Sequence, residues 1–462
     1  MTTHSYCVVG GGISGLTAAY RLRVAVGDHA TITLFDPGDR LGGVLRTELV
    51  GGRPMDLGAE AFVLRRPEMP ALLAELGLSG RQLATTGARP LIYSQQELHP
   101  LPAGTVVGIP SSATSMAGLV DETTVALIDA EPTRALAWQP GSDPAVAELV
   151  GDRFGEQVVA RSVDPLLSGV YAGSASTIGL RAAAPSVAAA LDRGATSLTE
   201  AVRQGLPPAA GAPIFGAIDG GYRVLIDELV DRGRPHWVRA PVEKLDRGER
   251  GWALLDGAGG HWHADAVILA VPAPRAAALL REIAPRACAA ASRITSASSV
   301  VVALAVPFDT PFPQCSGVLA ASGEQLRAKA ITLSSQKWGR KWGSDADVQL
   351  LRLSFGRFGD DLASRASDDE LLAWAVSDLA AVFGLDVEAV DTRVRRWIDA
   401  MPQYGPGHAD VVAELRAGLP PTLAVAGSYL DGIGVPACIG AAGRAAERVV
   451  RAVEGLDTEV AR

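Results

Sequence analysis

The apolar positions along the chain predict short buried strands that are each followed by a helix. Ser5–Val9 is an apolar run of residue types that favour strands, and residues 16–22 have helical spacing. A second apolar run, Thr31–Phe35, follows. Near the other end, Leu423–Gly427 is an apolar strand closed by glycine, and an Ala-rich helix is expected from about Ala437 to Glu454. Strands that alternate with helices predict an α/β fold with a doubly wound parallel sheet.

A glycine-rich turn joins the first strand to the first helix, and its residues are Gly10, Gly11, Gly12, Ile13, Ser14 and Gly15. Gly10 permits the tight turn, Gly12 lets the backbone approach a pyrophosphate, and Gly15 allows the helix to pack closely on the strand. The helix N-terminus then offers unpaired N–H groups and a positive dipole to the phosphates. Such a turn alone is a weak indication of a nucleotide site.

Two later features make the interpretation more specific. The second strand ends in Asp36, 21 residues after Gly15, where a carboxylate can accept hydrogen bonds from ribose hydroxyls. Arg40, Gly42 and Gly43 follow in an Arg-x-Gly-Gly loop. A simple NAD-binding domain has no need of that loop, whereas large FAD-binding oxidases characteristically carry one. The sequence therefore predicts FAD as the cofactor.

Three further segments resemble cofactor contacts of such FAD enzymes. The loop Met55–Phe62 looks like the one that passes beneath the flavin, and the loop after Leu423–Gly427 would aim its helix at the pyrimidine edge of the flavin. Taken alone, the second of these also fits the start of an ordinary helix. Within Val238–Val271, Val242 would meet the adenine through its backbone. The contacts expected from the first two segments are Gly58, Ala59, Glu60, Ala61, Gly427, Ile433, Gly434 and Val435.

Composition and charge narrow the class of protein. The length of 462 residues suggests about three domains, and 48% hydrophobic with 20% charged residues provides for a large core. The net charge of −9 argues against general binding to nucleic acid or to an anionic membrane. The four cysteines have neither metal-ligand nor CxxC spacing, so neither a disulfide framework nor a metal site is predicted.

No segment is expected to cross a membrane. The start of the chain lacks the basic region of a signal peptide. Prolines and glycines interrupt the uncharged stretch Leu98–Val120, and Ile294–Phe308 is short and rich in β-branched residues, so it predicts a buried strand. We therefore expect a soluble, cytoplasmic protein with no stable membrane insertion.

Three narrower segments lie between the cofactor motifs: Gly-Val-Tyr-Ala-Gly at 169–173, Ser-Gln-Lys-Trp at 335–338, and Pro-Gln-Tyr with Gly-His at 402–408. With these, nearly the whole chain resembles the FAD-dependent protoporphyrinogen/coproporphyrinogen oxidases of haem biosynthesis, and it is most like their soluble bacterial coproporphyrinogen III members. Some positions depart from the family pattern, namely Asp36 in place of Glu, Ser174 in place of Asp or Asn, and Ala437 in place of an acid.

The resemblance implies a six-electron oxidation of coproporphyrinogen III to coproporphyrin III by FAD, with O2 as acceptor and H2O2 as product. The lack of a membrane span favours this water-soluble tetra-anion over protoporphyrinogen IX. A protoporphyrinogen IX oxidase and a different flavin amine oxidase or carotenoid desaturase remain as alternatives, and a non-enzymatic FAD-binding protein is the least favoured. Contact with downstream haem-pathway enzymes is left open, and no catalytic acid or base is assigned.

The resemblance also implies residues for the substrate site. Lys337, in a segment expected to be a strand, and Arg65 and Arg66 would pair with propionates, although each also fits an ordinary surface charge. The segment Gly169, Val170 and Tyr171 would line the cavity, with a backbone carbonyl free to orient a pyrrole N–H. Trp397 matches a family tryptophan near the flavin.

These assignments predict three domains. The FAD-binding domain is discontinuous, from residues 1–88, 214–299 and 404–462, and is doubly wound. A mixed-β substrate-binding domain comprises residues 89–109 and 300–403, and a helical insertion comprises residues 110–213.

Overall fold

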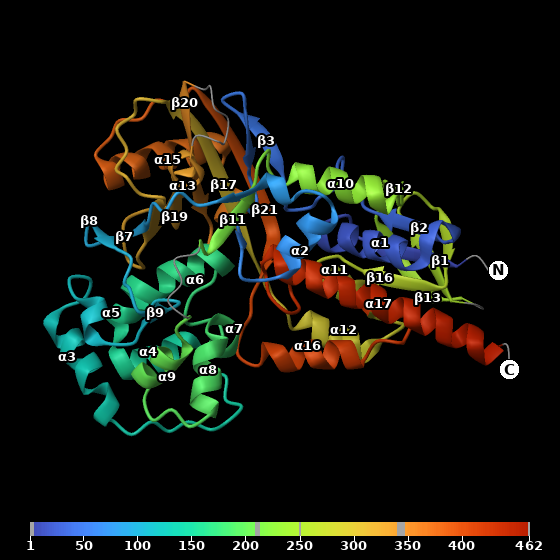
Figure 1. The fold of residues 1–462 in the computed structure, drawn as a ribbon, viewed down its shortest axis with the longest axis horizontal. Coiled ribbons are helices and arrows are strands. Elements are labelled where there is room, and N and C mark those ends of the chain that lie inside the picture. The colour runs from blue at the N-terminus through green and yellow to red at the C-terminus, as the bar shows by residue number, and fades with distance from the viewer. Residues whose placement is uncertain (1–3, 208–212, 249–250, 340–346, 461–462) are drawn as a thin grey trace.

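A parallel five-stranded sheet forms the centre of one half of the molecule (Figure 1). The computed structural model describes residues 4–207, 213–248, 251–339 and 347–460. The order of the strands is β12 (His236–Val238), β2 (Thr31–Phe35), β1 (Ser5–Val9), β16 (Ala266–Leu269) and β22 (Leu423–Val425), and every neighbouring pair is parallel. The sheet is thus assembled from three distant parts of the chain. The strands predicted near the N-terminus, Ser5–Val9 and Thr31–Phe35, and the strand predicted from Leu423 are confirmed.

Alternating side chains of β1 face two separate cores. Tyr6 and Val8 pack with the helices on one face, and Cys7 and Val9 pack with the layer on the other face. The first layer contains α1 (Ile13–Val26), α2 (Glu68–Glu75), α10 (Arg223–Gly233) and α17 (Val435–Val460). The second contains α11 (Ala273–Leu280), α12 (Pro285–Ser292), α16 (His408–Ala417) and the sheet of β13 (Val242–Arg247), β14 (Trp252–Asp256) and β15 (His261–Ala264).

A seven-stranded sheet forms the other half. Its order is β21 (Asp391–Pro402), β17 (Ser296–Pro307), β20 (Val348–Phe355), β19 (Ala330–Thr332), β18 (Gly317–Ala320), β7 (Pro90–Ser94) and β8 (Glu97–Pro100). The predicted buried strand Ile294–Phe308 is therefore confirmed as β17. One face packs on α14 (Leu362–Arg365) and α15 (Asp368–Phe383) through the side chains of Val302, Leu304 and Leu353.

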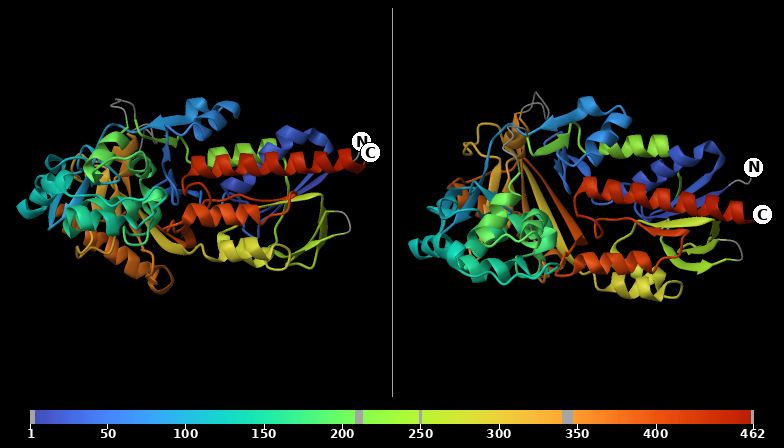
Figure 2. Two further views of the ribbon diagram at one scale, coloured as in Figure 1. Left: turned by 90° about the horizontal axis from the view of Figure 1, so that it is seen from below. Right: turned by 60° about the horizontal axis from the view of Figure 1, so that its bottom comes forward.

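Short strands connect the two large sheets. The hairpin of β3 (Thr47–Val50) and β4 (Arg53–Asp56) packs on β17, and β5 (Phe62–Val63), β11 (Phe215–Ile218) and β6 (Gln82–Ala84) form a three-stranded sheet. Two further short strands, β9 (Thr105–Val106) and β10 (Ile109–Pro110), pair with each other. In Figure 2, α17 lies along the half of the molecule that contains the parallel sheet.

The segment around Lys337 is a helix, so its expectation as a strand is wrong. The helix α13 covers Ser334–Trp338, and Lys337 N donates to Leu333 O at 2.9 Å. Gly339 ends it with a φ of +78°, a conformation that glycine adopts without strain. The buried Trp338 ring anchors the turn against the seven-stranded sheet.

The region between residues 110 and 207 is helical, as predicted. Its helices are α3 (Glu122–Ala130), α4 (Val146–Phe154), α5 (Glu156–Val158), α6 (Asp164–Tyr171), α7 (Leu180–Ala183), α8 (Pro185–Asp192) and α9 (Leu198–Gly205), with a π-helical stretch at Val159–Val163. They enclose an apolar core of their own that includes Val150, Phe154 and Leu167.

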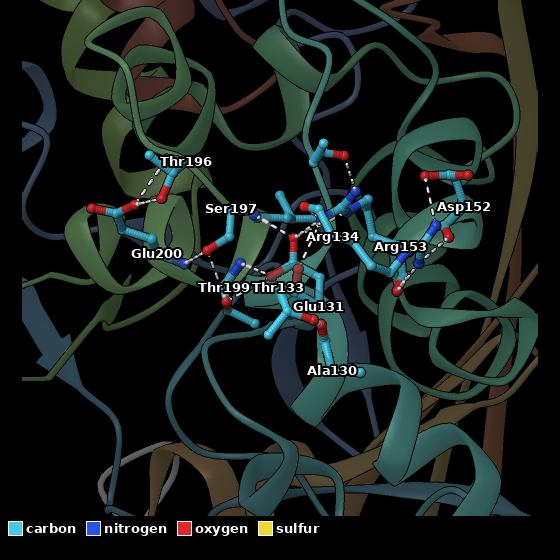
Figure 3. A network of polar contacts seen from close by, with 12 residues as sticks. Ala130, Glu131, Thr133, Arg134, Asp152, Arg153, Thr196, Ser197, Thr199 and Glu200 are labelled. Atoms are coloured by element: carbon cyan, nitrogen blue, oxygen red, sulfur yellow. Dashed lines mark hydrogen bonds and ion pairs between the residues drawn. The ribbon is translucent and has the colours of Figure 1, made fainter.

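A buried carboxylate ties three parts of this helical region together (Figure 3). Glu131 pairs with Arg153 at 2.9 Å, and it accepts hydrogen bonds from Leu198 N at 2.7 Å and Thr199 Oγ1 at 2.7 Å. Its side chain is 0% exposed. Thr199 N also donates to Glu131, at 3.1 Å, and both amides belong to the first turn of α9, so Glu131 satisfies both an opposite charge and a helix N-terminus.

Candidate functional site

The turn after β1 leaves a helix N-terminus free of side-chain caps. Gly10 has a φ of +108°, and a Cβ at Gly15 would overlap the carbonyl oxygen of Gly10, so both positions require glycine. Gly12 precedes α1 without a side-chain cap, and no acidic residue lies in the first turn of α1. A Cβ at Gly12 would find only Gly43 Cα, at 4.0 Å. The cradle is open beside Gly12, and its donors suit a phosphate.

Asp36 and Arg40 order the loops around this turn. The Asp36 carboxylate accepts hydrogen bonds from Gly11 N at 2.7 Å and Gly38 N at 2.8 Å, and each oxygen keeps a lone pair for a ribose hydroxyl. The Arg40 guanidinium donates to the carbonyls of Gly43 at 2.7 Å and Leu45 at 2.9 Å. Arg40 therefore shapes the loop of Gly42 and Gly43 by holding its backbone.

The loop that follows β4 approaches the same opening. A Cβ at Gly58 would overlap the carbonyl oxygen of Val44, so this crossing requires glycine. Val44 is 41% exposed although it is apolar, and Gly58 and Ala59 are half-buried. Trp397 Nε1 donates to Leu57 O at 2.8 Å, which places Trp397 against this loop. An apolar strip beside the phosphate cradle suits the ring system of a dinucleotide cofactor.

Glu60 points from this loop into the protein. Its side chain is 0% exposed, and it contacts Lys337 Nζ at 2.8 Å and Ser334 Oγ at 2.6 Å. Burial alone would raise the pKa of Glu60, but the cations of Arg352 and Lys337 outweigh it and lower that pKa to about 2. Lys337, expected at a substrate carboxylate, thus has a carboxylate partner inside the protein.

The second helix N-terminus lies beside the first. Ile13, at the start of α1, and Val435, at the start of α17, belong to one apolar core, and Gly434 before α17 is exposed. Burial raises the pKa of the Cys438 thiol to about 11, and a hydrogen bond with Ser14 partly offsets this. The first turn of α17 carries no acidic residue. Both helix dipoles therefore favour negative charge in the same region.

Beside Asp36 lie two residues that the sequence did not single out as site residues, Trp237 and Arg239. Trp237 Nε1 donates to Asp36 O at 3.1 Å, and the Arg239 guanidinium lies over the Trp237 ring at 4.4 Å. Val242 is buried, and its carbonyl accepts a hydrogen bond from Arg275 at 2.6 Å. A tryptophan in an apolar strand predicts core packing, so only the structure reveals that Trp237 lies beside Asp36.

One face of the seven-stranded sheet forms a second wall of the site. Strand alternation places Leu319, Ala330, Thr332 and Ser354 on this face, and all four are half-buried. Their neighbours on the opposite face, such as Ile331 and Leu353, are buried in the core under α15. This face also carries Arg352 opposite Thr332, and its mixture of apolar and hydroxyl-bearing side chains beside one cation suits a flat, broad, anionic ligand.

The expected substrate residues lie in different surroundings. Gly169 and Val170 are exposed at the end of α6, and a Cβ at Gly169 would be 3.6 Å from Leu319. The Tyr171 carbonyl accepts a hydrogen bond from Gln403 Nε2 at 2.8 Å. Arg65 and Arg66 are both exposed, and Arg66 pairs with Glu68 at 2.9 Å.

Among the residues that the structure describes, no cluster of His, Cys, Asp and Glu has the geometry of a metal site. Within the same ranges, no helix has both the length and the apolar character needed to span a bilayer.

The chain is similar in sequence and in structure to known flavin-dependent oxidases. The family of flavin-containing amine oxidoreductases matches residues 13–450. The chain is 76% identical to coproporphyrinogen III oxidase of Mycobacterium tuberculosis, over all of both chains, and 27% identical to the Bacillus subtilis protein of the same name, over 94% of this chain and 95% of that one. A provisionally named protoporphyrinogen oxidase from Exiguobacterium superposes with a TM-score of 0.86 at 27% identity, covering 97% of this chain and 99% of that one.

Proposed function

The chain belongs to the family of flavin-containing amine oxidoreductases, and we propose that it is a member that oxidises coproporphyrinogen III to coproporphyrin III with bound FAD. The observation that carries the substrate is the 76% identity over the whole length with a mycobacterial coproporphyrinogen III oxidase. The position of Gly169, whose added Cβ would be 3.6 Å from Leu319 on the second wall, supports it. We include in the proposal the three-domain division and a cytoplasmic location.

The residues of both glycine-rich loops fit FAD. Gly12 and the first turn of α1 would bind the pyrophosphate, Asp36 the adenosine ribose, and Trp237 with Val242 would lie at the adenine. The strip of Val44, Gly58 and Ala59 would contact the flavin ring, and the first turn of α17 would face its pyrimidine edge. Bound FAD would supply a two-electron acceptor, which takes up one hydride in each cycle.

The overall reaction needs three such cycles. Coproporphyrinogen III and three O2 give coproporphyrin III and three H2O2, so that six electrons and six hydrogens leave the macrocycle. The protein's own work is to orient the macrocycle and to exclude water. The sheet face of Leu319, Ala330 and Thr332 would support one side of the ring, and Gly169 with Val170 would close the edge.

No acid–base pair is assigned to the reaction. Aromatisation of the product favours the reaction strongly, so a positioned base is not required for an overall driving force. The four propionates call for cations near the rim, and the exposed Arg65 and Arg66 are candidates. The Lys337 ammonium already pairs with the Glu60 carboxylate, so we do not assign it to a propionate.

The direct test is aerobic turnover of purified, detergent-free protein on coproporphyrinogen III and on protoporphyrinogen IX. Porphyrin fluorescence and H2O2 are measured together. The proposal predicts a clear preference in kcat/KM for coproporphyrinogen, with three H2O2 formed for each porphyrin. A preference for protoporphyrinogen would transfer the assignment to that substrate, and bound flavin without porphyrin formation from either would refute both.

A further inference from the structure

The backbone of the loop that follows β4 is held from the seven-stranded sheet at three successive carbonyls. Arg352, on β20, donates to Asp56 O at 3.1 Å and to Gly58 O at 2.8 Å. Trp397, on β21, donates to Leu57 O at 2.8 Å. Residues 57–61 are called the cofactor loop below. Each of these bonds joins positions about 300 or more residues apart in sequence, so the attachment belongs to the tertiary fold.

The Glu60 side chain, near the far end of the cofactor loop, is held by α13 and by β20. Glu60 accepts hydrogen bonds from Lys337 and Ser334, both on α13, and Arg352 Nη2 lies 3.8 Å from its Oε2 atom. The exposed fraction is 0% for the Glu60 side chain, 18% for Lys337 and 14% for Arg352. Two cations therefore face one buried anion, and such groups interact strongly because little water screens them.

The two cations stand next to the wall assigned to the substrate. Arg352 lies opposite Thr332 in the register of β20 and β19, and α13 begins two residues after β19 ends. The strands that would support the macrocycle therefore also carry the groups that fix the cofactor loop. Arg352 shares the face of Thr332, whereas Lys337 lies on α13 and faces Glu60, so the two cations are tested separately.

We propose that Arg352 and Lys337 are positioning residues that clamp the cofactor loop to the seven-stranded sheet and thereby set the flavin's environment. The inference rests on the proposed function only in taking FAD as the group that faces the loop. Lys337 acts here through Glu60, whereas the sequence placed it on a substrate propionate. The two roles make different predictions for one set of variants.

The first experiment compares Lys337→Met, Glu60→Gln and the double variant. Removing one member of a buried ion pair leaves the other uncompensated, whereas removing both does not. The clamp predicts that the Kd for FAD rises about 10-fold in Lys337→Met and falls back to within about threefold of wild type in the double variant. FAD is titrated into the flavin-free protein, and the quenching of flavin fluorescence is measured.

A propionate-binding lysine predicts the opposite pattern. Lys337→Met would then raise KM for the porphyrinogen and leave the Kd for FAD unchanged. Adding Glu60→Gln to it would not restore the KM. That result would overturn the clamp. As a matched control, Lys244→Met removes an exposed lysine that pairs with Asp246 on β13, and it should leave FAD binding unchanged.

The second experiment substitutes Arg352. Arg352→Lys keeps the charge but loses the fork that holds two carbonyls, and Arg352→Gln loses both. We expect Arg352→Gln to shift the absorption bands of bound FAD and to lower its midpoint potential, because a cation near the ring favours the reduced anion, with Arg352→Lys intermediate. Arg396→Gln is the control, since Arg396 pairs with Asp368 and holds the Ala366 carbonyl on the opposite face of the sheet.

Unchanged spectra and potentials in both Arg352 variants would refute a clamp at that residue. Circular dichroism and the unfolding midpoint show whether each variant has folded, and the lysine variants test the clamp if Arg352→Gln has not. Because FAD is titrated without substrate, the outcome is separate from the substrate assignment. Wild-type protein that binds FAD but oxidises no porphyrinogen would refute that assignment while the titration still tests the clamp.

Discussion

The substitution Gly12→Ala separates a glycine required by the cofactor from one required by the fold. Gly12 has φ −72° and ψ −179°, which alanine adopts without strain, and the nearest atom to an added Cβ is 4.0 Å away. Alanine lowers the entropy of the unfolded chain, which stabilises by about 0.4–1 kcal/mol, and it is a poorer N-cap than glycine, which costs a similar amount. The flavin-free protein should therefore unfold within about 0.5 kcal/mol of wild type.

The effect on FAD should be much larger. If the pyrophosphate lies in the cradle beside Gly12, a methyl group there pushes it away from the first turn of α1. Two charge-assisted hydrogen bonds would be lost or lengthened, at about 1.5 kcal/mol each, so the Kd for FAD should rise about 100-fold. Titration of FAD into the flavin-free protein measures this, and differential scanning fluorimetry without FAD measures the stability.

Two comparison variants make the test sharp. Gly15→Ala places a Cβ onto the Gly10 carbonyl and should destabilise the flavin-free protein as well. Gly80→Ala adds a Cβ with no atom within 4 Å, far from the cradle in sequence, and it should leave FAD affinity unchanged while stabilising the flavin-free protein by at most about 1 kcal/mol. Unaltered FAD affinity in Gly12→Ala would show that the pyrophosphate lies elsewhere, and it would refute the interpretation of this turn.

Three further outcomes are expected. Gly58→Ala places a Cβ onto the Val44 carbonyl, so it should weaken FAD binding and lower the unfolding midpoint of the flavin-free protein together; a change in only one of them would contradict this. Glu131→Gln leaves Arg153 buried without its counter-charge and should cost about 3 kcal/mol in urea unfolding, with FAD affinity unchanged. Burial, reinforced by Arg357, lowers the pKa of Lys329 to about 7. Above that pH the unfolded chain binds more protons than the folded one. The free energy of unfolding of the wild type should therefore rise by about 2 kcal/mol relative to that of Lys329→Met between pH 7 and 9. A difference between the two proteins that does not depend on pH would contradict this.

The parallel sheet could be predicted from the sequence because its signals are local. The strand Thr31–Phe35 and the turn of Gly10–Gly15 each depend on residues adjacent in sequence, and the structure has the strand with the same bounds. The helix at Ser334–Trp338 was missed because a five-residue segment is too short for a period to show. What decides it is the glycine at 339 and the burial of Trp338.

The partners of charged residues could not be predicted in the same way. Glu60 and Lys337 are 277 residues apart, and nothing in either neighbourhood indicates the other. The position of Lys337 in a segment typical of the family suggested a contact with the substrate. In the structure its partner is an internal carboxylate, that of Glu60. The half-buried face of Ala330, Thr332 and Ser354 could not be predicted without the register of β19 and β20, two strands that lie on either side of residues 340–346 in the sequence.

The order of strands in the parallel sheet has a consequence for synthesis on the ribosome. β1 and β2 leave the ribosome first, but their neighbours β12 and β16 follow more than 200 residues later, and β22 begins at residue 423 of 462. At about 5–20 residues per second, synthesis of the roughly 150 residues between β16 and β22 leaves the edge of β16 without its partner for about 8–30 s. The nascent chain must keep this edge from pairing with other chains, and a premature stop codon before Leu423 would leave it permanently open.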